Sequence, residues 1–281
     1  MTKRTIKKQY KNYLFKIIKK QNSKKTEKRG RKNGHSVSYY LNKILKVLFD
    51  GCTWESLDSI CDNSTIRKTF YKWRDENVFI MGYQKLLDKY LQNKGHITNL
   101  FIDSTVIENQ NSDEDLGYNF KYKGKKSRKI TTVVTEDRIT VAYVISKSSP
   151  YDVNFVEPVV NNIPIKMEPS YHKPLYIIGD KGYLSKKIKA NLKKDNIILV
   201  YPNKKNAKTK TTYRYKKKLK GRYVVEASYS HLKRSYKRLK LIYDRKTKNF
   251  TTFFEMALTC EIIKYFISKR KLTLVINKLG L

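Results

Sequence analysis

The spacing of apolar residues changes near residue 97, and this change constrains the fold more than any other feature of the chain. Between residues 36 and 95 apolar side chains such as Leu41, Leu45 and Leu48 recur at intervals of three and four, as on a helix with one buried face. Beyond residue 97 they fall into short runs rich in β-branched and aromatic residues, which are typical of strands. The sequence therefore predicts a helical region followed by a region that contains a sheet.

The second region alternates strands with helices. Strand-like runs lie at 98–107, 127–147, 174–183 and 196–202, and a turn at Glu136 and Asp137 divides the second run. Helices are expected at 152–161, 185–194, 223–242 and 250–268. The basic stretch 203–221 has no apolar period and is predicted to be a loop. This order indicates an α/β fold with a mixed sheet and flanking helices, preceded by a small all-helical domain.

Positive charge dominates the chain and predicts a polyanionic partner. The formal net charge is +38, and like charges repel one another when a chain compacts. Nucleic acid is the first candidate, while an anionic membrane surface or a ribosome-like structural role would also fit the charge alone. Residues 1–34 contain fourteen Lys or Arg and one acid, Glu27. We expect residues 1–35 to form a basic, flexible arm, either disordered, lying on phosphates, or acting as a nuclear-import signal.

Residues 36–95 are predicted to be a helical DNA-binding domain resembling a helix-turn-helix. Thr53 can cap one short helix, and Asn63 or Ser64 can cap a second. A plain helical bundle with solvated charges is the alternative. In the DNA-binding interpretation, the outer face of the second helix contacts phosphates and base edges. The residues expected on that face are Arg67, Lys68, Tyr71, Lys72 and Arg74.

The cysteines and the hydropathy indicate a soluble intracellular protein. Cys52, Cys61 and Cys260 are far apart and form no C-x-x-C pair, which argues against a disulfide framework or a zinc finger. The first twenty residues hold no uninterrupted apolar stretch of signal-peptide length. The sequence has no apolar run near the ~20 residues needed to span a bilayer, so no membrane partner is expected.

Three carboxylates stand out against this basic background. Asp103 and Asp180 follow apolar strand residues, where an unpaired buried charge costs several kcal/mol. Glu226 lies in a helix within residues 196–254, which hold eighteen Lys or Arg and two acids. Each could be ordinary alone: the aspartates could cap turns, and Glu226 could pair with Arg222 one turn earlier. Together they are the hard oxygen ligands that Mg²⁺ or Mn²⁺ requires, and two such ions can promote phosphodiester transfer.

The chain resembles the DDE transposases of bacterial insertion sequences from about residue 38 to residue 268. The residues that carry the likeness are "FIDST" around Asp103, "YKGKKSRKITTVVTEDRITVAYVIS", "SSPYDVNFVEPV" and "IIGDKGY" around Asp180. These enzymes often show Tyr, two residues, Arg, three residues, Glu, six residues, Lys. Arg222, Glu226 and Lys233 keep that spacing, which places them on one face of a helix. Leu219 replaces the leading Tyr, and Tyr151 replaces the His that usually precedes the Asp of the "SPYD" segment.

The resemblance implies a ribonuclease H-like catalytic domain at 96–281, with Asp103, Asp180 and Glu226 as catalytic metal ligands for two Mg²⁺ or Mn²⁺ ions. It implies cleavage of double-stranded DNA at the ends of a mobile element, followed by attack of the freed 3′-hydroxyl on target DNA. Arg222, Lys233 and Lys237 would contact DNA, and a homodimer or higher synaptic complex is expected. The alternatives are an inactive or domesticated transposase that only binds DNA, and a plain nuclease of the same fold. The compartment would be the bacterial cytoplasm or nucleoid, or a nucleus or viral factory in a eukaryotic host.

Overall fold

We describe the protein from a computed structural model. The structure describes residues 2–22, 34–119, 124–164, 169–203, 206 and 211–269. The chain divides into two compact units. The first unit comprises Met1–Tyr90 and Lys233–Leu281, and the second comprises Leu91–Leu232. The C-terminal segment thus groups with the N-terminal helices, whereas the sequence placed it with the sheet.

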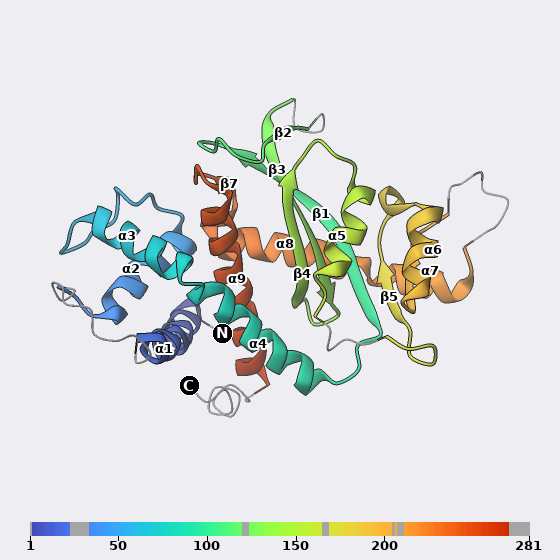
Figure 1. Ribbon diagram of the computed structural model, residues 1–281, viewed down its shortest axis with the longest axis horizontal. Coiled ribbons are helices and arrows are strands. Elements are labelled where there is room, and N and C mark those ends of the chain that lie inside the picture. The colour runs from blue at the N-terminus through green and yellow to red at the C-terminus, as the bar shows by residue number, and fades with distance from the viewer. Residues whose placement is uncertain are drawn as a thin grey trace. The chain divides into compact units, whose positions relative to one another are not determined.

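The first unit is built from helices. They are α1 (Lys3–Asn22), α2 (Val37–Asp50), α3 (Asn63–Asp75), most of α4 (Val78–Lys94) and α9 (Thr247–Ser268). In Figure 1, α1 to α3 are blue, α4 is blue-green and α9 is red. The core is aromatic: the rings of Phe70 in α3 and Phe253 in α9 stack with centroids 4.7 Å apart, and Trp54 packs on Phe70 at 5.3 Å. Burial of such large rings dominates the energetics of a core. Helix α9 therefore belongs to the same apolar core as α3.

The N-terminal segment differs from the predicted flexible arm. Residues 3–22 form α1, in which Tyr10, Tyr13 and Leu14 are fully buried and the Tyr13 hydroxyl donates to the carbonyl of Gly82 at 2.9 Å. The apolar residues recur at helical spacing between the lysines, so the lysines occupy the exposed face. The many lysines of this segment made its apolar stripe hard to recognise from the sequence. Residue 1 and residues 23–33 of the expected arm lie outside the described residues.

The predicted first short helix after Thr53 is absent from this described stretch. Residues 51–62 form turns and bends, because Trp54 and Leu57 are buried and hold the segment against the core. Helix α2 ends at Gly51, whose φ of 70° is left-handed and suits glycine. Helix α3 is capped by Asp62 through the N–H of Ser64, one residue before the expected cap. The helical region is present, but two tandem short helices are not.

The second unit contains the predicted mixed sheet (Figure 1). Its main strands are β1 (Asn99–Asn109), β3 (Lys126–Thr135), β4 (Thr140–Lys147), β5 (Leu175–Ile178) and β6 (Ile197–Val200). Strand β1 runs antiparallel to β3 and parallel to β5, and β5 runs parallel to β6. Strand β4 pairs with β3, as does the short β2 (Gly117–Tyr118). The α/β class expected from the sequence is confirmed.

Helices and short 3₁₀ turns surround this sheet. They are η2 (Asp152–Phe155), α5 (Val156–Asn161), η4 (Lys181–Tyr183), α6 (Lys186–Lys194), α7 (Tyr213–Leu219), η5 (Lys220–Arg222) and α8 (Tyr223–Ser235). Val225 and Tyr229 of α8 pack against Phe101 of β1 in one apolar cluster. The predicted loop at 203–221 therefore contains a helix, α7. The helix expected at 223–242 ends at Ser235, and η6 (Lys237–Leu239) and β7 (Leu241–Ile242) follow it. None of the described helices is long and apolar enough to cross a membrane.

Candidate active site

Asp103 lies in the middle of β1, next to a direct link between the sheet and α8. The Tyr229 hydroxyl of α8 donates to the carbonyl of Asp103 at 2.6 Å and accepts from the N–H of Thr132 at 3.0 Å. The side chain of Asp103 accepts from the N–H of Ser104 at 2.8 Å. Buried hydrogen bonds of this kind fix the elements that they join. Tyr229 thus holds α8 against the strand at the position of Asp103.

Asp180 lies one residue beyond Gly179, just after β5 ends. It caps the turn η4, accepting from the N–H of Gly182 at 2.7 Å. A Cβ atom at Gly179 would lie 2.8 Å from the ring of Tyr183 and 3.0 Å from Ile102. Only glycine fits so close an approach, so the turn is held against the strand that carries Asp103.

Glu226 lies in the first turn of α8, and its position depends on the residues before it. A Cβ atom at Gly221 would lie 2.7 Å from two ring atoms of Phe101, so η5 is packed directly on β1. The side chain of Glu226 is 62% exposed and pairs with Arg222 at 3.5 Å. Tyr229 follows one turn later on the same helix. The helix therefore presents an exposed carboxylate one turn from the residue that contacts Asp103.

The three carboxylates share one electrostatic neighbourhood. Burial raises the pKa of Asp103 to about 6; the hydrogen bond from Ser104 and the charge of Arg222 oppose this rise, while Asp180 and Glu226 add to it. The charges of Asp180 and Glu226 therefore both act on Asp103. As the side chains stand, no three His, Cys, Asp or Glu residues of the described ranges lie close enough together to hold a metal ion.

The donor set nevertheless fits a hard divalent cation. Mg²⁺ binds through one or two carboxylates and keeps several waters, so it does not need a closed cage of protein oxygens. Like charges beside a buried acid raise its pKa, and a bound cation would reverse that effect. Asp103, Asp180 and Glu226 are the side chains that would hold such an ion.

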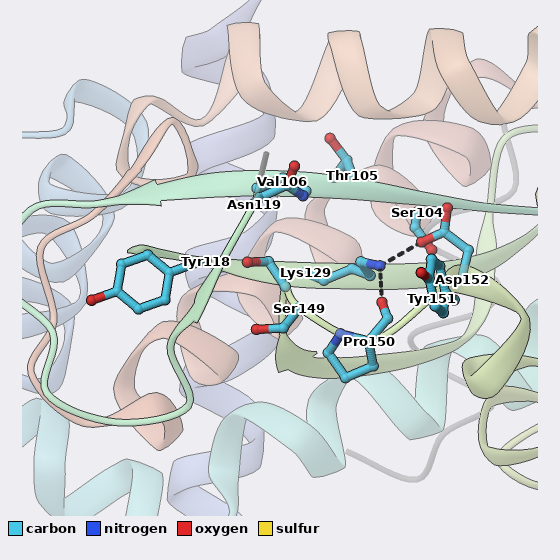
Figure 2. A pocket seen from close by; sticks show the side chains of 11 residues that line it. Ser104, Thr105, Val106, Tyr118, Asn119, Lys129, Ser149, Pro150, Tyr151 and Asp152 are labelled. Carbon is cyan, nitrogen blue, oxygen red and sulfur yellow. Dashed lines mark hydrogen bonds and ion pairs between the residues drawn. The ribbon is translucent and has the colours of Figure 1, made fainter. Parts of the chain in front are cut away.

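An ion pair that sequence reasoning missed lies beside these acids. The Lys129 ammonium of β3, whose side chain is 7% exposed, is 2.6 Å from Asp152 and donates to the carbonyl of Pro150 at 2.5 Å (Figure 2). A Cβ atom at Gly182 would lie 2.9 Å from Asp180 Oδ1 and 3.8 Å from Asp152 Oδ2. The carboxylates of Asp152 and Asp180 thus flank the same glycine. The "SSPYD" segment was the available signal, but Lys129 lies in an apolar strand that gave none.

A chain of hydroxyl groups supports the site from the other face of β1. The oxygen of Ser104 lies 2.9 Å from the Tyr183 hydroxyl and 2.8 Å from that of Thr131. These contacts join the turn after Asp180 to strands β1 and β3. They add a second link between the elements that carry Asp103 and Asp180.

The predicted DNA contacts near α8 differ in accessibility. The Arg222 side chain is 25% exposed, and its Nε is buried with no hydrogen-bond partner among the described residues. Such an orphaned donor is costly unless a further group binds it. Burial lowers the pKa of Lys233 at the end of α8. Lys237, in η6, is exposed.

The predicted DNA-reading face of α3 is only partly exposed. Lys68 and Lys72 are exposed, Tyr71 is half-buried, and Arg67 pairs with Glu55 at 3.2 Å. The Arg74 side chain is 10% exposed, pairs with Asp75 at 2.7 Å and donates to Asn249 of α9. The prediction that Arg74 lies on the outer face is therefore wrong. Its guanidinium instead joins α3 to α9 within the helical unit.

A mixed sheet in which β1 lies between the antiparallel β3 and the parallel β5, with helices packed beside it, is a ribonuclease H-like fold. The transposase DDE domain family matches residues 94–260, and the chain belongs to that family. No curated protein sequence matches the chain.

Two solved transposases resemble the chain in structure. The piggyBac transposase, in a synaptic complex with hairpin DNA, is similar with a TM-score of 0.52 and 9% identity, over 98% of this chain and 76% of that one. The Mos1 mariner transposase, in a paired end complex with Mn, gives a TM-score of 0.34 and 11% identity over 96% and 86%. The similarity to the piggyBac transposase supports the fold described above. The TM-score with the Mos1 transposase is too low to support a fold assignment.

Proposed function

We propose that this transposase cleaves DNA at the ends of a mobile element in a reaction that needs Mg²⁺ or Mn²⁺, and then joins the freed 3′-hydroxyl to target DNA. The observation that supports the proposal is that the charges of Asp180, Glu226 and Arg222 all act on the half-buried Asp103. Divalent ions held there would activate the attacking oxygen and stabilise the leaving one. Cleavage breaks the bond between phosphorus and the 3′ oxygen, with water supplying the new oxygen. Strand transfer forms a new bond from the 3′ oxygen to a target phosphorus, and the target's own 3′ oxygen leaves.

The residues of the chain have separate tasks in this proposal. Asp103, Asp180 and Glu226 hold the cations in their ionised forms. Arg222 binds a phosphate oxygen through the exposed part of its guanidinium. Tyr229 acts as a positioning residue, because it holds α8 at the carbonyl of Asp103. The excess of positive charge binds the DNA backbone.

We propose further that the helical region at 36–95 contributes DNA contacts through Lys68 and Lys72, which are exposed on α3. Lys233 and Lys237 are proposed to contact DNA near the ends of α8. A homodimer or larger complex on two DNA ends is proposed for strand transfer, because two ends must be held together while they are joined.

The test uses purified full-length protein, Mg²⁺ and DNA taken from both flanks of the gene. The wild type should nick this DNA and yield joined products with a target plasmid. Asp103→Asn, Asp180→Asn and Glu226→Gln should reduce both products at least 100-fold and still bind the DNA. Asp195→Asn is the matched control, since Asp195 is an exposed acid of the same unit, at the end of α6.

Each outcome separates the proposal from its rivals. Equal binding without cleavage by wild type and variants would support a protein that only binds DNA. Cleavage without joined products would indicate a plain nuclease. Retained cleavage in all three acid variants would contradict the assignment of the site.

A further inference from the structure

A pocket of about 360 Å³ lies over strands β1 and β3, on the face of β1 that carries Ser104, and Asp152 is part of its lining (Figure 2). Ser104, Thr105 and Val106, which directly follow Asp103, line one side of it, and Lys129 crosses it toward Asp152. The remaining lining comes from residues 118–119 and 148–151. Because the Asp152 carboxylate also flanks Gly182 with Asp180, the pocket adjoins the proposed active site.

The walls of the pocket are held in place by direct contacts. The Ser148 hydroxyl donates to the carbonyl of Gly117 at 2.7 Å and accepts from Ser127 at 2.8 Å. A Cβ atom at Gly117 would overlap Ser149 and lie 2.9 Å from the N–H nitrogen of Ser148. The segment that carries Tyr118 is therefore fixed to the segment that carries Tyr151. These contacts therefore hold the walls of the pocket in fixed positions within this unit.

Two tyrosines stand at its ends with unusual exposure. Tyr118 is 60% exposed and Tyr151 is 81% exposed, and Figure 2 places them at opposite ends of the pocket. The Lys126 ammonium lies 6.0 Å from the centroid of the Tyr118 ring. Exposed aromatic rings beside cations are the features on which nucleic-acid bases stack while their phosphates are neutralised.

The charge inside the pocket favours an uncharged group. Lys129 is neutralised by Asp152 and donates to the Pro150 carbonyl, so the interior offers a phosphate no excess positive charge. Hydroxyl, amide and backbone groups of the lining can form hydrogen bonds with the edge of a base. The volume is near the lower limit for ligand pockets and fits one nucleotide unit, not a duplex.

We infer that this pocket binds the base of one unpaired nucleotide of the DNA strand that lies at the acids, with the base stacked on Tyr151. The adjoining phosphate lies outside, toward Lys126. The inference rests on the proposed function, because it takes DNA as the substrate. It makes Tyr151, which replaces a histidine of the resembling enzymes, a binding residue for single-stranded DNA beside the cleavage position.

The test measures base stacking by fluorescence, under conditions in which the DNA is not cleaved. Full-length protein carrying Asp103→Asn is mixed, without metal, with a DNA duplex that has a short single-stranded 3′ overhang containing 2-aminopurine. Stacking on tyrosine should quench the fluorescence of this base. Tyr151→Phe should retain the quenching, whereas Tyr151→Ala should abolish it and weaken binding of the overhang DNA about 5- to 150-fold. Tyr171→Ala is the matched control, because Tyr171 is 84% exposed in the same unit and lies outside the pocket.

Unchanged quenching and affinity in Tyr151→Ala would overturn the inference, as would equal binding of a fully paired duplex. Tyr118→Ala provides a second variant: it should reduce binding of the overhang, and wild-type binding in both tyrosine variants would also count against the pocket. The two proposals fail separately. Quenching by a protein that never cleaves DNA would leave the pocket standing, while cleavage without quenching would leave only the proposed function.

Discussion

At the scale of single residues, Asp103 combines burial with proximity to other acids. The surrounding protein disfavours its charged form, whereas a metal ligand must be charged. A bound cation would offset both the burial of the Asp103 charge and its repulsion by the neighbouring acids. This arrangement makes the metal-free protein less stable near neutral pH than its packing alone would give.

The pKa of Asp103 predicts a pH-dependent gain in stability for Asp103→Asn. The folded-state pKa is about 6 and the ordinary value is 3.8. Between these values the folded protein keeps a proton that the unfolded chain releases, so stability falls as the pH rises and stays reduced above 6. Without metal, Asp103→Asn should therefore raise the free energy of unfolding by up to about 3 kcal/mol at pH 8 and change it little at pH 4. Urea unfolding at both pH values measures this, with Asp195→Asn as the control; equal effects at the two pH values would contradict it.

Single residues also show what sequence reasoning could and could not find. Asp103, Asp180 and Glu226 were recognisable because an acid after apolar strand residues, or alone in a basic helix, conflicts with its surroundings. Lys129 was not recognisable, because its partner Asp152 is 23 positions away and only the fold brings them together. Arg74 was placed on the wrong face for a related reason: its partner Asn249 lies in α9.

At the scale of elements, the site depends on how closely η5 and α8 approach β1. Tyr229 fixes one turn of α8, and Gly221 allows the preceding turn to rest on Phe101. Apolar periodicity predicted α8 but placed its end at residue 242, although it ends at Ser235. Periodicity also missed α1 and α7, because their lysines dominate the composition of each segment. Contacts between elements, rather than propensity, set these boundaries.

The contact between Gly221 and Phe101 predicts a specific loss of function. In Gly221→Ala the new methyl group overlaps the ring, so α8 must shift away from β1. Overpacking of this kind costs about 1–3 kcal/mol, and the shift should reduce Mg²⁺-dependent cleavage by more than the loss of folded protein explains. Thermal unfolding and cleavage rates are measured together. Gly34→Ala is the control, because no atom lies within 4 Å of its new methyl group. Adding Phe101→Leu to Gly221→Ala should restore part of the activity, since the smaller side chain relieves the overlap. Wild-type behaviour of Gly221→Ala would show that the contact is unimportant.

At the scale of the whole molecule, the net charge of +38 determines how the protein meets DNA. Each phosphate that a basic side chain neutralises releases counterions, and the logarithm of the association constant should fall by about 0.9 per phosphate for each tenfold rise in salt. Arg222→Ala should make this slope shallower by about one. Fluorescence anisotropy with labelled duplex DNA measures the slope, and circular dichroism at each salt concentration checks that the protein stays folded. An affinity independent of salt would contradict the electrostatic argument.

The helical unit consists of two segments of the chain, one before and one after the segment that forms the sheet unit. This order affects how the helical unit folds during synthesis. Helices α1 to α4 are translated first, but the Phe253 ring that stacks on Phe70 arrives only after Leu91–Leu232 has been made. At ribosomal speeds of about 5–20 residues per second, that interval is roughly 7–30 seconds. Throughout it the nascent N-terminal helices keep an uncovered aromatic surface, so chaperones have their clearest opportunity to bind before the last helix emerges.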